Sequence, residues 1–200
     1  INIEIGTPNQ SSGQAAYQAL EVAVADIKNA LIDALVTLPI NKDSIQGQNF
    51  NFKGHTEYLE DRTGTNENHK ALMILANEDL RVALVTTHLP IAEVASNINT
   101  PLIIEKLKTL NFSLKRDFFI DNPRIAVLSL NPHAGENGLL GTEEQEIISP
   151  AIQQCADDNI LCSGPYAADG FFGSEKYKQF DAILAMDHDQ GLVPFKTIAM

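Results

Sequence analysis

Apolar runs without a polar face alternate with amphipathic segments along most of the sequence. The run at 181–186 is apolar almost throughout, which is typical of a strand that is buried on both sides. The segment at 14–33 instead places its apolar residues at helical spacing. A sheet whose strands are buried on both sides needs helices over both faces, so this alternation predicts the α/β class.

These two patterns also give the expected elements. Pro39 marks the end of one expected strand. Thr142 lies three residues before Gln145, which is the pattern of a capping box at a helix start. We expect helices at 14–33, 54–64, 90–99, 101–111 and 141–158. We expect strands at 34–42, 70–77, 80–90, 124–135 and 181–186, with a hairpin turn at 77–79.

The chain is acidic, with 26 Asp and Glu against 14 Lys and Arg and a formal net charge of -12. Nucleic acids bind basic surfaces, so we expect no nucleic-acid partner. No apolar stretch approaches the length of a membrane span, so we expect no membrane partner either. Cys155 and Cys162 match no zinc or redox motif and fit a reducing compartment, which predicts a cytoplasmic location.

Three of the five histidines occur in the same context, at the end of an apolar run. VALVTTH ends at His88, IAVLSLNPH ends at His133, and AILAMDH ends at His188. The carboxyl ends of parallel strands share one sheet edge, where α/β proteins bind ligands. Three neutral imidazoles there would bind a divalent ion and leave positions open for a substrate. Alternatively, each histidine is satisfied locally, because the sequence does not show which strands are neighbours.

A second group of candidates could bind an anion. His55 and Thr56 follow Gly54 at an expected helix start, where exposed amides attract anions. The alternative is that Thr56 caps the helix beside an incidental histidine. Lys42 and Lys196 each follow a strand-end loop and suit a phosphate or a carboxylate. The alternative for both lysines is a solvated side chain.

The glycines of NPHAGENGLLG do not have the spacing of the dinucleotide-binding fingerprint, and no P-loop signature occurs. Several other motifs, in this order, resemble the 4-hydroxythreonine-4-phosphate dehydrogenase family of pyridoxal phosphate biosynthesis. They are GHTE, TTHLPI, LNPHAGE, LGTEE, HDQG and PFK, and the resemblance covers nearly all 200 residues. It implies a three-layer α/β/α sandwich that resembles the isocitrate and isopropylmalate dehydrogenases and is not a Rossmann fold.

The resemblance also implies roles for individual residues. The implied ligands of one divalent ion (zinc, cobalt or magnesium) are His88, His133 and His188. The implied substrate-binding residues are His55, Thr56, Lys196 and Asp169. The candidates for catalytic groups are Lys42 and Asp189.

This chain departs from the family pattern in two ways. Leu38 stands where the family usually has a small residue, which would reshape the loop before Lys42. The family's Gly-rich opening strand and its downstream substrate-binding Asn and Arg positions have no counterpart here. We therefore expect residues 1–200 to be the central fragment of a longer dehydrogenase chain, and expect the fragment alone to be inactive.

The implied function is NAD-dependent oxidation of 4-phosphooxy-threonine, followed by decarboxylation to 3-amino-2-oxopropyl phosphate, in pyridoxine 5'-phosphate biosynthesis. The metal ion would lower the pKa of the substrate hydroxyl and stabilise the enolate that decarboxylation leaves. The resemblance also implies a homodimer with shared active sites, in which His188 comes from a different subunit than His88 and His133.

Three alternatives remain open from the sequence. The first is a dehydrogenase whose substrate is a four-carbon sugar-acid phosphate, such as threonate or erythronate phosphate. A metal-dependent hydrolase is the second alternative, since three histidines and a water also suit hydrolysis. The third is a chain that binds metal or partner chains without turnover. The metal, the residues that contact NAD and the general base are not identifiable from the sequence.

Overall fold

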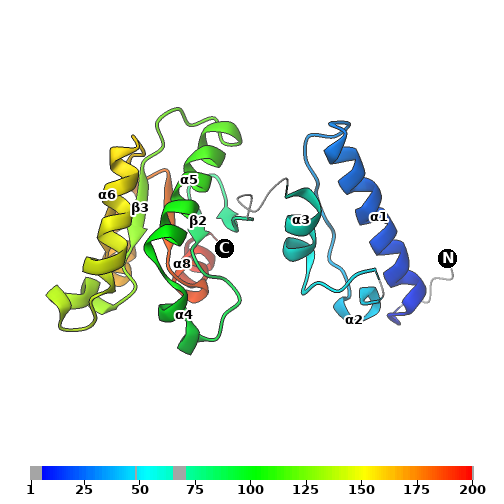
Figure 1. The fold of residues 1–200 in the computed structure, drawn as a ribbon, viewed down its shortest axis with the longest axis horizontal. Helices are drawn as coiled ribbons and strands as arrows, with labels where there is room; N and C mark the ends of the chain where they lie inside the picture. The colour runs from blue at the N-terminus through cyan, green and yellow to red at the C-terminus, as the bar shows by residue number, and fades with distance from the viewer. Residues whose placement is uncertain (1–5, 48, 65–70, 200) are drawn as a thin grey trace. The chain divides into compact units, whose positions relative to one another are not determined.

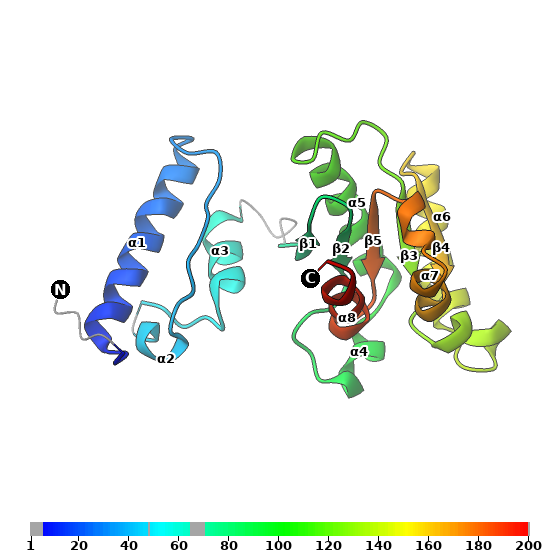
Figure 2. The same ribbon diagram turned by 180° about the vertical axis from the view of Figure 1, so that it is seen from behind.

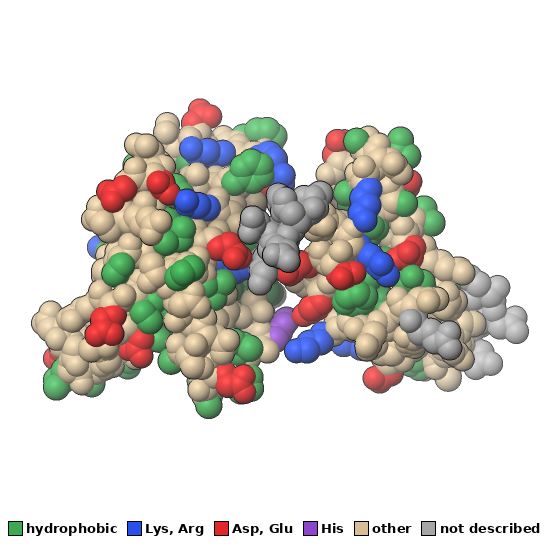
Figure 3. Space-filling model, viewed as in Figure 1, with side chains coloured by type: hydrophobic (Ala, Val, Ile, Leu, Met, Phe, Trp, Pro, Cys, Tyr) green, Lys and Arg blue, Asp and Glu red, His purple; other side chains and the backbone are tan. Residues whose placement is uncertain are grey.

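The structure is a computed structural model that describes residues 6–47, 49–64 and 71–199 (Figure 1, Figure 2). The chain forms two compact units, Ile1–Ala71 and Leu72–Met200. None of the helices in the described ranges is long and apolar enough to span a membrane. On the face shown in Figure 3, basic side chains lie scattered among acidic and polar ones.

Three helices occur among the described residues of the N-terminal unit: α1 (Gln10–Lys28), α2 (Lys42–Ile45) and α3 (His55–Thr63). Helix α1 begins before the expected residue 14 because Asn9 caps it. The Asn9 side chain accepts a hydrogen bond from the Ser12 amide (2.9 Å), and the Ser12 hydroxyl accepts one from the Asn9 amide (3.4 Å). The helix ends before the expected residue 33, since Ala30 adopts a left-handed conformation with φ of 53°.

An aromatic core holds the N-terminal unit together. The Tyr58 ring is fully buried and stacks on Phe50, with ring centroids 5.3 Å apart. The Tyr58 hydroxyl donates a hydrogen bond to Glu21 on α1 (2.5 Å). These contacts fix α3, which begins with His55, against α1.

The strand expected at 34–42 is not present. Residues 34–40 form neither a strand nor a helix, and Lys42 already begins α2. Val36 and Leu38 remain 91% and 81% exposed. A strand exists only where a neighbouring strand pairs with its backbone, and the described residues of this unit contain no strand. The apolar composition of this segment suits a strand, but composition does not show whether a neighbouring strand is present to pair with it.

The C-terminal unit is built on a five-stranded sheet in the order β1-β2-β5-β3-β4. Strands β2, β5, β3 and β4 are parallel, and β1 pairs with β2 in the antiparallel sense. The expected hairpin is confirmed, and the Asn77 side chain closes its turn by accepting from the amide of Leu80 (2.7 Å). The strands are β1 (Ile74–Ala76), β2 (Arg81–Leu84), β3 (Ile125–Leu128), β4 (Cys162–Tyr166) and β5 (Ala182–Ala185).

Helices cover both faces of this sheet, which confirms the α/β class and the three layers (Figure 2). On β5, Leu184 packs with residues of α4, α5 and α6, whereas Ile183 packs with Phe171 of α7 and Phe195 of α8. Because both faces are covered, every residue of β3 and β5 is buried, which explains their uninterrupted apolar sequence. The helices are α4 (Ile91–Asn97), α5 (Thr100–Arg116), α6 (Ser149–Asp157), α7 (Ala168–Gly173) and α8 (His188–Ala199).

The segment expected as one helix at 141–158 differs in its first turns. Glu144–Ile148 is a wider π-helical segment, and α6 follows it at Ser149. The expected capping-box contact of Thr142 is replaced by its backbone carbonyl, which accepts from the amides of Gln145 (3.0 Å) and Glu146 (2.9 Å). The strand expected at 124–135 likewise ends at Leu128, and a tight turn at Pro132–Gly138 follows.

Candidate active site

Strands β2, β5 and β3 lie next to one another in the sheet and run parallel. His88 follows β2, His188 follows β5, and His133 follows β3. All three histidines therefore come after the carboxyl ends of adjacent strands, at one edge of the sheet. The sequence does not show that these three strands are neighbours, whereas the sheet topology does.

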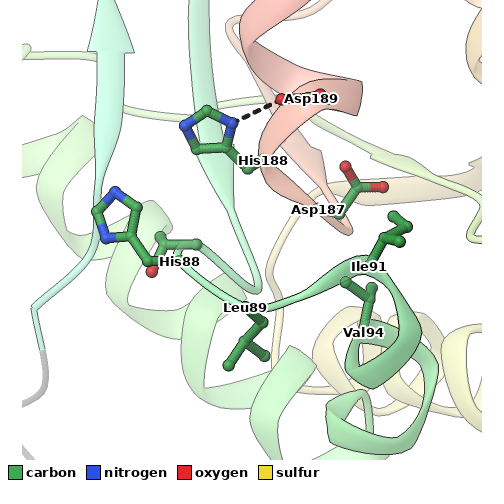
Figure 4. Close-up of a pocket in the computed structure, with 8 residues that line it drawn as sticks. His88, Leu89, Ile91, Val94, Asp187, His188 and Asp189 are labelled. Carbon is green, nitrogen blue, oxygen red and sulfur yellow. Dashed lines mark hydrogen bonds and ion pairs between the residues drawn. The ribbon is translucent and has the colours of Figure 1, made fainter.

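His88 and His188 face one cavity at this edge (Figure 4). Their ring centroids lie 5.9 Å apart, with an angle of 44° between the ring planes. The cavity measures about 340 Å³. Its lining combines the two imidazoles with carboxylates and an apolar wall: Thr87, His88, Leu89, Ile91, Val94, Asp187, His188 and Asp189.

The HDQG motif explains why His188 lies at the mouth of this cavity. Asp187 directly precedes α8 and caps its first turn, since its carboxylate accepts from the amide of Gln190 (3.0 Å). Gly191 lets α8 lie directly on β2, because a Cβ atom there would come within 2.4 Å of the Leu84 side chain. His188 is thereby held in the first turn of α8, directly beyond the end of β5.

Asp189 orients the His188 ring. Its Oδ1 atom lies 2.8 Å from His188 Nδ1. A carboxylate only accepts, so a neutral His188 carries its proton on Nδ1 and keeps the lone pair on Nε2. This is the state in which imidazole binds a metal ion.

His133 lies in an unusual turn. Its backbone is left-handed, with φ of 52° and ψ of 29°, and the next four residues are also left-handed. Successive non-glycine residues rarely adopt this conformation, so the surrounding structure must hold it. The buried carboxylate of Glu144 does so by accepting from the amides of Leu130 (2.8 Å) and Asn131 (2.7 Å). At Gly135, a Cβ atom would lie 2.6 Å from Glu144 Oε2.

The structure brings two of the three predicted ligands together. His133 does not line the cavity that His88 and His188 share. Within residues 6–47, 49–64 and 71–199 there is no group of three potential ligands from His, Cys, Asp and Glu that could hold a metal ion. Within this chain, His88 and His188 therefore lie near each other, and His133 is not beside them.

Two of the remaining predicted residues belong to the C-terminal unit and do not line this cavity. Lys196 is exposed in the last turn of α8, and Asp169 is exposed in the first turn of α7. Lys42, His55 and Thr56 belong to the N-terminal unit. Lys42 begins α2, and His55 and Thr56 begin α3.

Gly54 is the N-cap residue of α3, and because glycine has no side chain it makes no capping hydrogen bond. Thr56 lies inside the helix, so the alternative in which it is the N-cap is wrong. The half-buried His55 also lines a second cavity of about 330 Å³ that includes Leu38 and Pro39. Gly54 itself offers no side-chain acceptor to the first-turn amides of α3, and amides at a helix start attract anions.

Sequence reasoning missed Gln190 and Glu144. Both side chains bind backbone groups next to the histidine segments, and Glu144 is only 3% exposed. The available signal was their position, since each lies within a motif that also carries or follows a histidine. Their partners are backbone atoms, which no side-chain pattern reveals.

A mixed sheet with helices on both faces and histidines at adjacent strand ends defines an α/β protein with a strand-end site. Comparison with known families is more specific. The family model of the pyridoxal phosphate biosynthetic protein PdxA matches residues 1–200. The chain belongs to the PdxA family, as the motifs predicted.

Relatives and solved structures agree with this assignment. A 4-hydroxythreonine-4-phosphate dehydrogenase of Bacteroides thetaiotaomicron is 56% identical over 200 residues, which are 100% of this chain and 54% of the relative. One of Sulfurihydrogenibium sp. is 42% identical over 198 residues, 99% of this chain and 60% of the relative. The crystal structure of the enzyme from Klebsiella pneumoniae matches with a TM-score of 0.88 at 32% identity, covering 98% of this chain and 58% of that one. The chain thus spans little more than half the length of these proteins.

Proposed function

We propose that the complete protein is an NAD-dependent dehydrogenase that converts 4-phosphooxy-threonine (4-hydroxythreonine 4-phosphate) to 3-amino-2-oxopropyl phosphate and carbon dioxide. The observation that carries the proposal is the facing pair His88 and His188 at adjacent strand ends, in a chain of the PdxA family. The names of the relatives support the same reaction. The free thiols of Cys155 and Cys162 support a reducing, cytoplasmic compartment.

Two of the side chains at the cavity, both imidazoles, are of a kind that binds divalent metal ions. His88 and His188 direct imidazoles at one space, and Asp189 leaves Nε2 of His188 as the ligand atom. Imidazole nitrogen suits zinc or cobalt better than magnesium. We assign the ion to these two residues together with His133. When bound, it would supply the Lewis acidity that polarises the substrate's oxygen during oxidation and decarboxylation.

Four exposed or half-exposed groups are assigned to the substrate itself. Lys196 would bind an anionic group as a point charge, which an acidic chain has to supply locally. His55 and Thr56 would bind a second anionic group together with backbone amides at the start of α3. Asp169 would accept a hydrogen bond from the substrate's amino group.

Removal of the hydroxyl proton needs a base near the cavity. Asp189 lines the cavity, and its side chain is 84% exposed, so it remains accessible to a substrate. It is our first candidate for the acceptor of that proton, and Lys42 of the N-terminal unit is the second. The proton goes to the base and the hydride goes to NAD, so the alcohol carbon becomes a ketone.

We also propose a homodimer with shared sites. The turn that carries His133 exposes Leu139 and Leu140, which are 77% and 41% accessible, and such apolar side chains suit a covered surface. The family resemblance assigns His188 to a different subunit from His88 and His133. The facing rings of His88 and His188 in one chain favour a second division, in which His133 is the residue that crosses to the other subunit.

A substrate comparison tests the proposed function. The complete protein is incubated with NAD and a divalent ion, and NADH formation is followed with 4-phosphooxy-threonine, threonate phosphate or erythronate phosphate. We expect turnover with the first substrate and its loss when the ion is removed with a chelator. Preference for a sugar-acid phosphate would show that the proposed substrate is wrong. Phosphate release without any need for NAD would show that the enzyme is a hydrolase and not a dehydrogenase.

A further inference from the structure

Gln190 binds the backbone of two different strand ends. It lies in the first turn of α8, two residues after His188. Its Oε1 atom accepts from the amide of Met186, directly after β5 (2.8 Å). Its Nε2 atom donates to the carbonyl of Ser129, directly after β3 (2.6 Å). One side-chain amide therefore connects the helix that carries His188 to both strands.

These bonds continue the sheet where its own pairing stops. The register between β3 and β5 ends with the pair Val127 and Leu184. Beyond that pair, the Gln190 amide supplies one acceptor and one donor, as a peptide group of a neighbouring strand would. The two strand ends are thus joined through a side chain at the level at which the histidine segments leave the sheet.

The connection reaches His88 through Met186. The carbonyl of Met186 accepts from both the amide (3.1 Å) and the hydroxyl (2.8 Å) of Thr86. Thr86 lies two residues before His88, and Met186 lies two residues before His188. The backbone that leads to each imidazole is therefore fixed by the same small group of hydrogen bonds, and Gln190 anchors that group to β3.

We propose that Gln190 is a positioning residue for the metal site: it sets the place of the His188 ring relative to the His88 ring. This inference rests on the proposed metal binding by that pair. It goes beyond the reaction because it assigns a role to a side chain that is not a ligand. Residues that orient metal ligands typically change metal affinity by about 10- to 100-fold when they are replaced.

The test measures zinc affinity in the complete protein, by competition between the metal-free protein and a chromophoric chelator. Gln190→Met keeps the length of the side chain and removes both hydrogen bonds. Gln190→Asn keeps the amide but is one methylene too short to reach both partners. The matched control is Gln153→Met, because Gln153 is exposed on α6 and its amide donates to Asp157 of the same helix (2.9 Å).

We expect both Gln190 variants to bind zinc about 10- to 100-fold more weakly than the wild type, and the control to bind it unchanged. In a His188→Ala background, Gln190→Met should weaken binding no further, because the residue acts through His188. Circular dichroism of the metal-free variants checks that they are folded, and Gln190→Asn is the variant to use if Gln190→Met is not.

Two other results would overturn the inference. If the wild type binds zinc and the folded Gln190 variants match the Gln153 control, Gln190 only stabilises the fold, while the proposed function stands. If the wild type itself does not bind divalent ions, the proposed metal site is wrong, and the role of Gln190 in it is wrong as well.

Discussion

The imidazole rings of His88 and His188 lie 5.9 Å apart between centroids, although the two residues are far apart in the sequence. Strands β2 and β5 bring them together because these strands are parallel neighbours with the register Leu84 to Ala185. Each histidine lies a few residues after the end of its strand. The pair is therefore a direct product of the sheet topology, and it is the centre of the proposed metal site.

Subunit mixing shows which chain supplies each ligand. The complete protein is prepared as three variants: His88→Ala, His133→Ala and His188→Ala. They are mixed in pairs, and the subunits are then allowed to exchange. If sites are shared, the His133→Ala and His188→Ala pair should regain activity, up to about half of the sites, because one site receives both lesions and the other receives neither.

The other two mixtures distinguish the divisions. Recovery with the His88→Ala and His133→Ala pair means that His133 crosses between subunits, which the facing rings favour. Recovery with the His88→Ala and His188→Ala pair instead means that His188 crosses, as the family resemblance implies. No recovery in any mixture that forms heterodimers would contradict a shared site.

Lys196→Ala should raise the Michaelis constant for the phosphorylated substrate by about 10- to 100-fold, the effect of losing a charge-assisted hydrogen bond. The bound metal should not change, because Lys196 does not line the cavity of the two histidines. Lys115→Ala is the matched control, since Lys115 is exposed near the end of α5. Steady-state kinetics with metal analysis give both quantities, and an unaltered Michaelis constant removes Lys196 from the substrate site.

Glu144→Gln should lower the free energy of unfolding by about 1–3 kcal/mol. The buried carboxylate accepts from two backbone amides, and a glutamine amide group would direct a donor at one of its present partners. Urea denaturation of the metal-free protein measures the change. Glu146→Gln, at an exposed position on the same segment, should have an effect below about 0.5 kcal/mol. Equal effects of the two substitutions would mean that Glu144 does not hold the His133 turn.

The N-terminal unit should lose stability in alkali because of Tyr58. Burial and the hydrogen bond to Glu21 raise the pKa of Tyr58 well above its ordinary value of 10.0. The unfolded chain then loses the phenol proton first, so the stabilisation is complete below about pH 10 and declines as the pH rises further. The thermal unfolding temperature of the wild type should therefore fall more steeply above this pH than the unfolding temperature of the Tyr58→Phe variant. Parallel curves would contradict the assignment.

Much of this architecture follows from the sequence because local signals and tertiary structure agree. Strands β3 and β5, which precede His133 and His188, are apolar throughout because both sheet faces are covered, and that composition can be read directly from the sequence. The expected helices at 54–64, 90–99 and 101–111 correspond to α3, α4 and α5, whose apolar spacing reflects the core that they cover.

Other features depend on contacts that no local pattern encodes. The segment 34–42 has the composition of a strand, but pairing decides whether a strand forms. The left-handed turn at His133 depends on a carboxylate that binds backbone amides, and the bridge of Gln190 has two backbone partners. The order β2-β5-β3, which makes neighbours of the three histidine segments, is likewise a property of the assembled sheet.

The most direct test of the central claim is an anomalous diffraction measurement on crystals of the complete protein grown with zinc. The account predicts an anomalous peak in the cavity at the ends of β2 and β5, about 2.0–2.1 Å from a ring nitrogen of both His88 and His188. A zinc ion bound elsewhere, or bound to only one of these two rings, would contradict it.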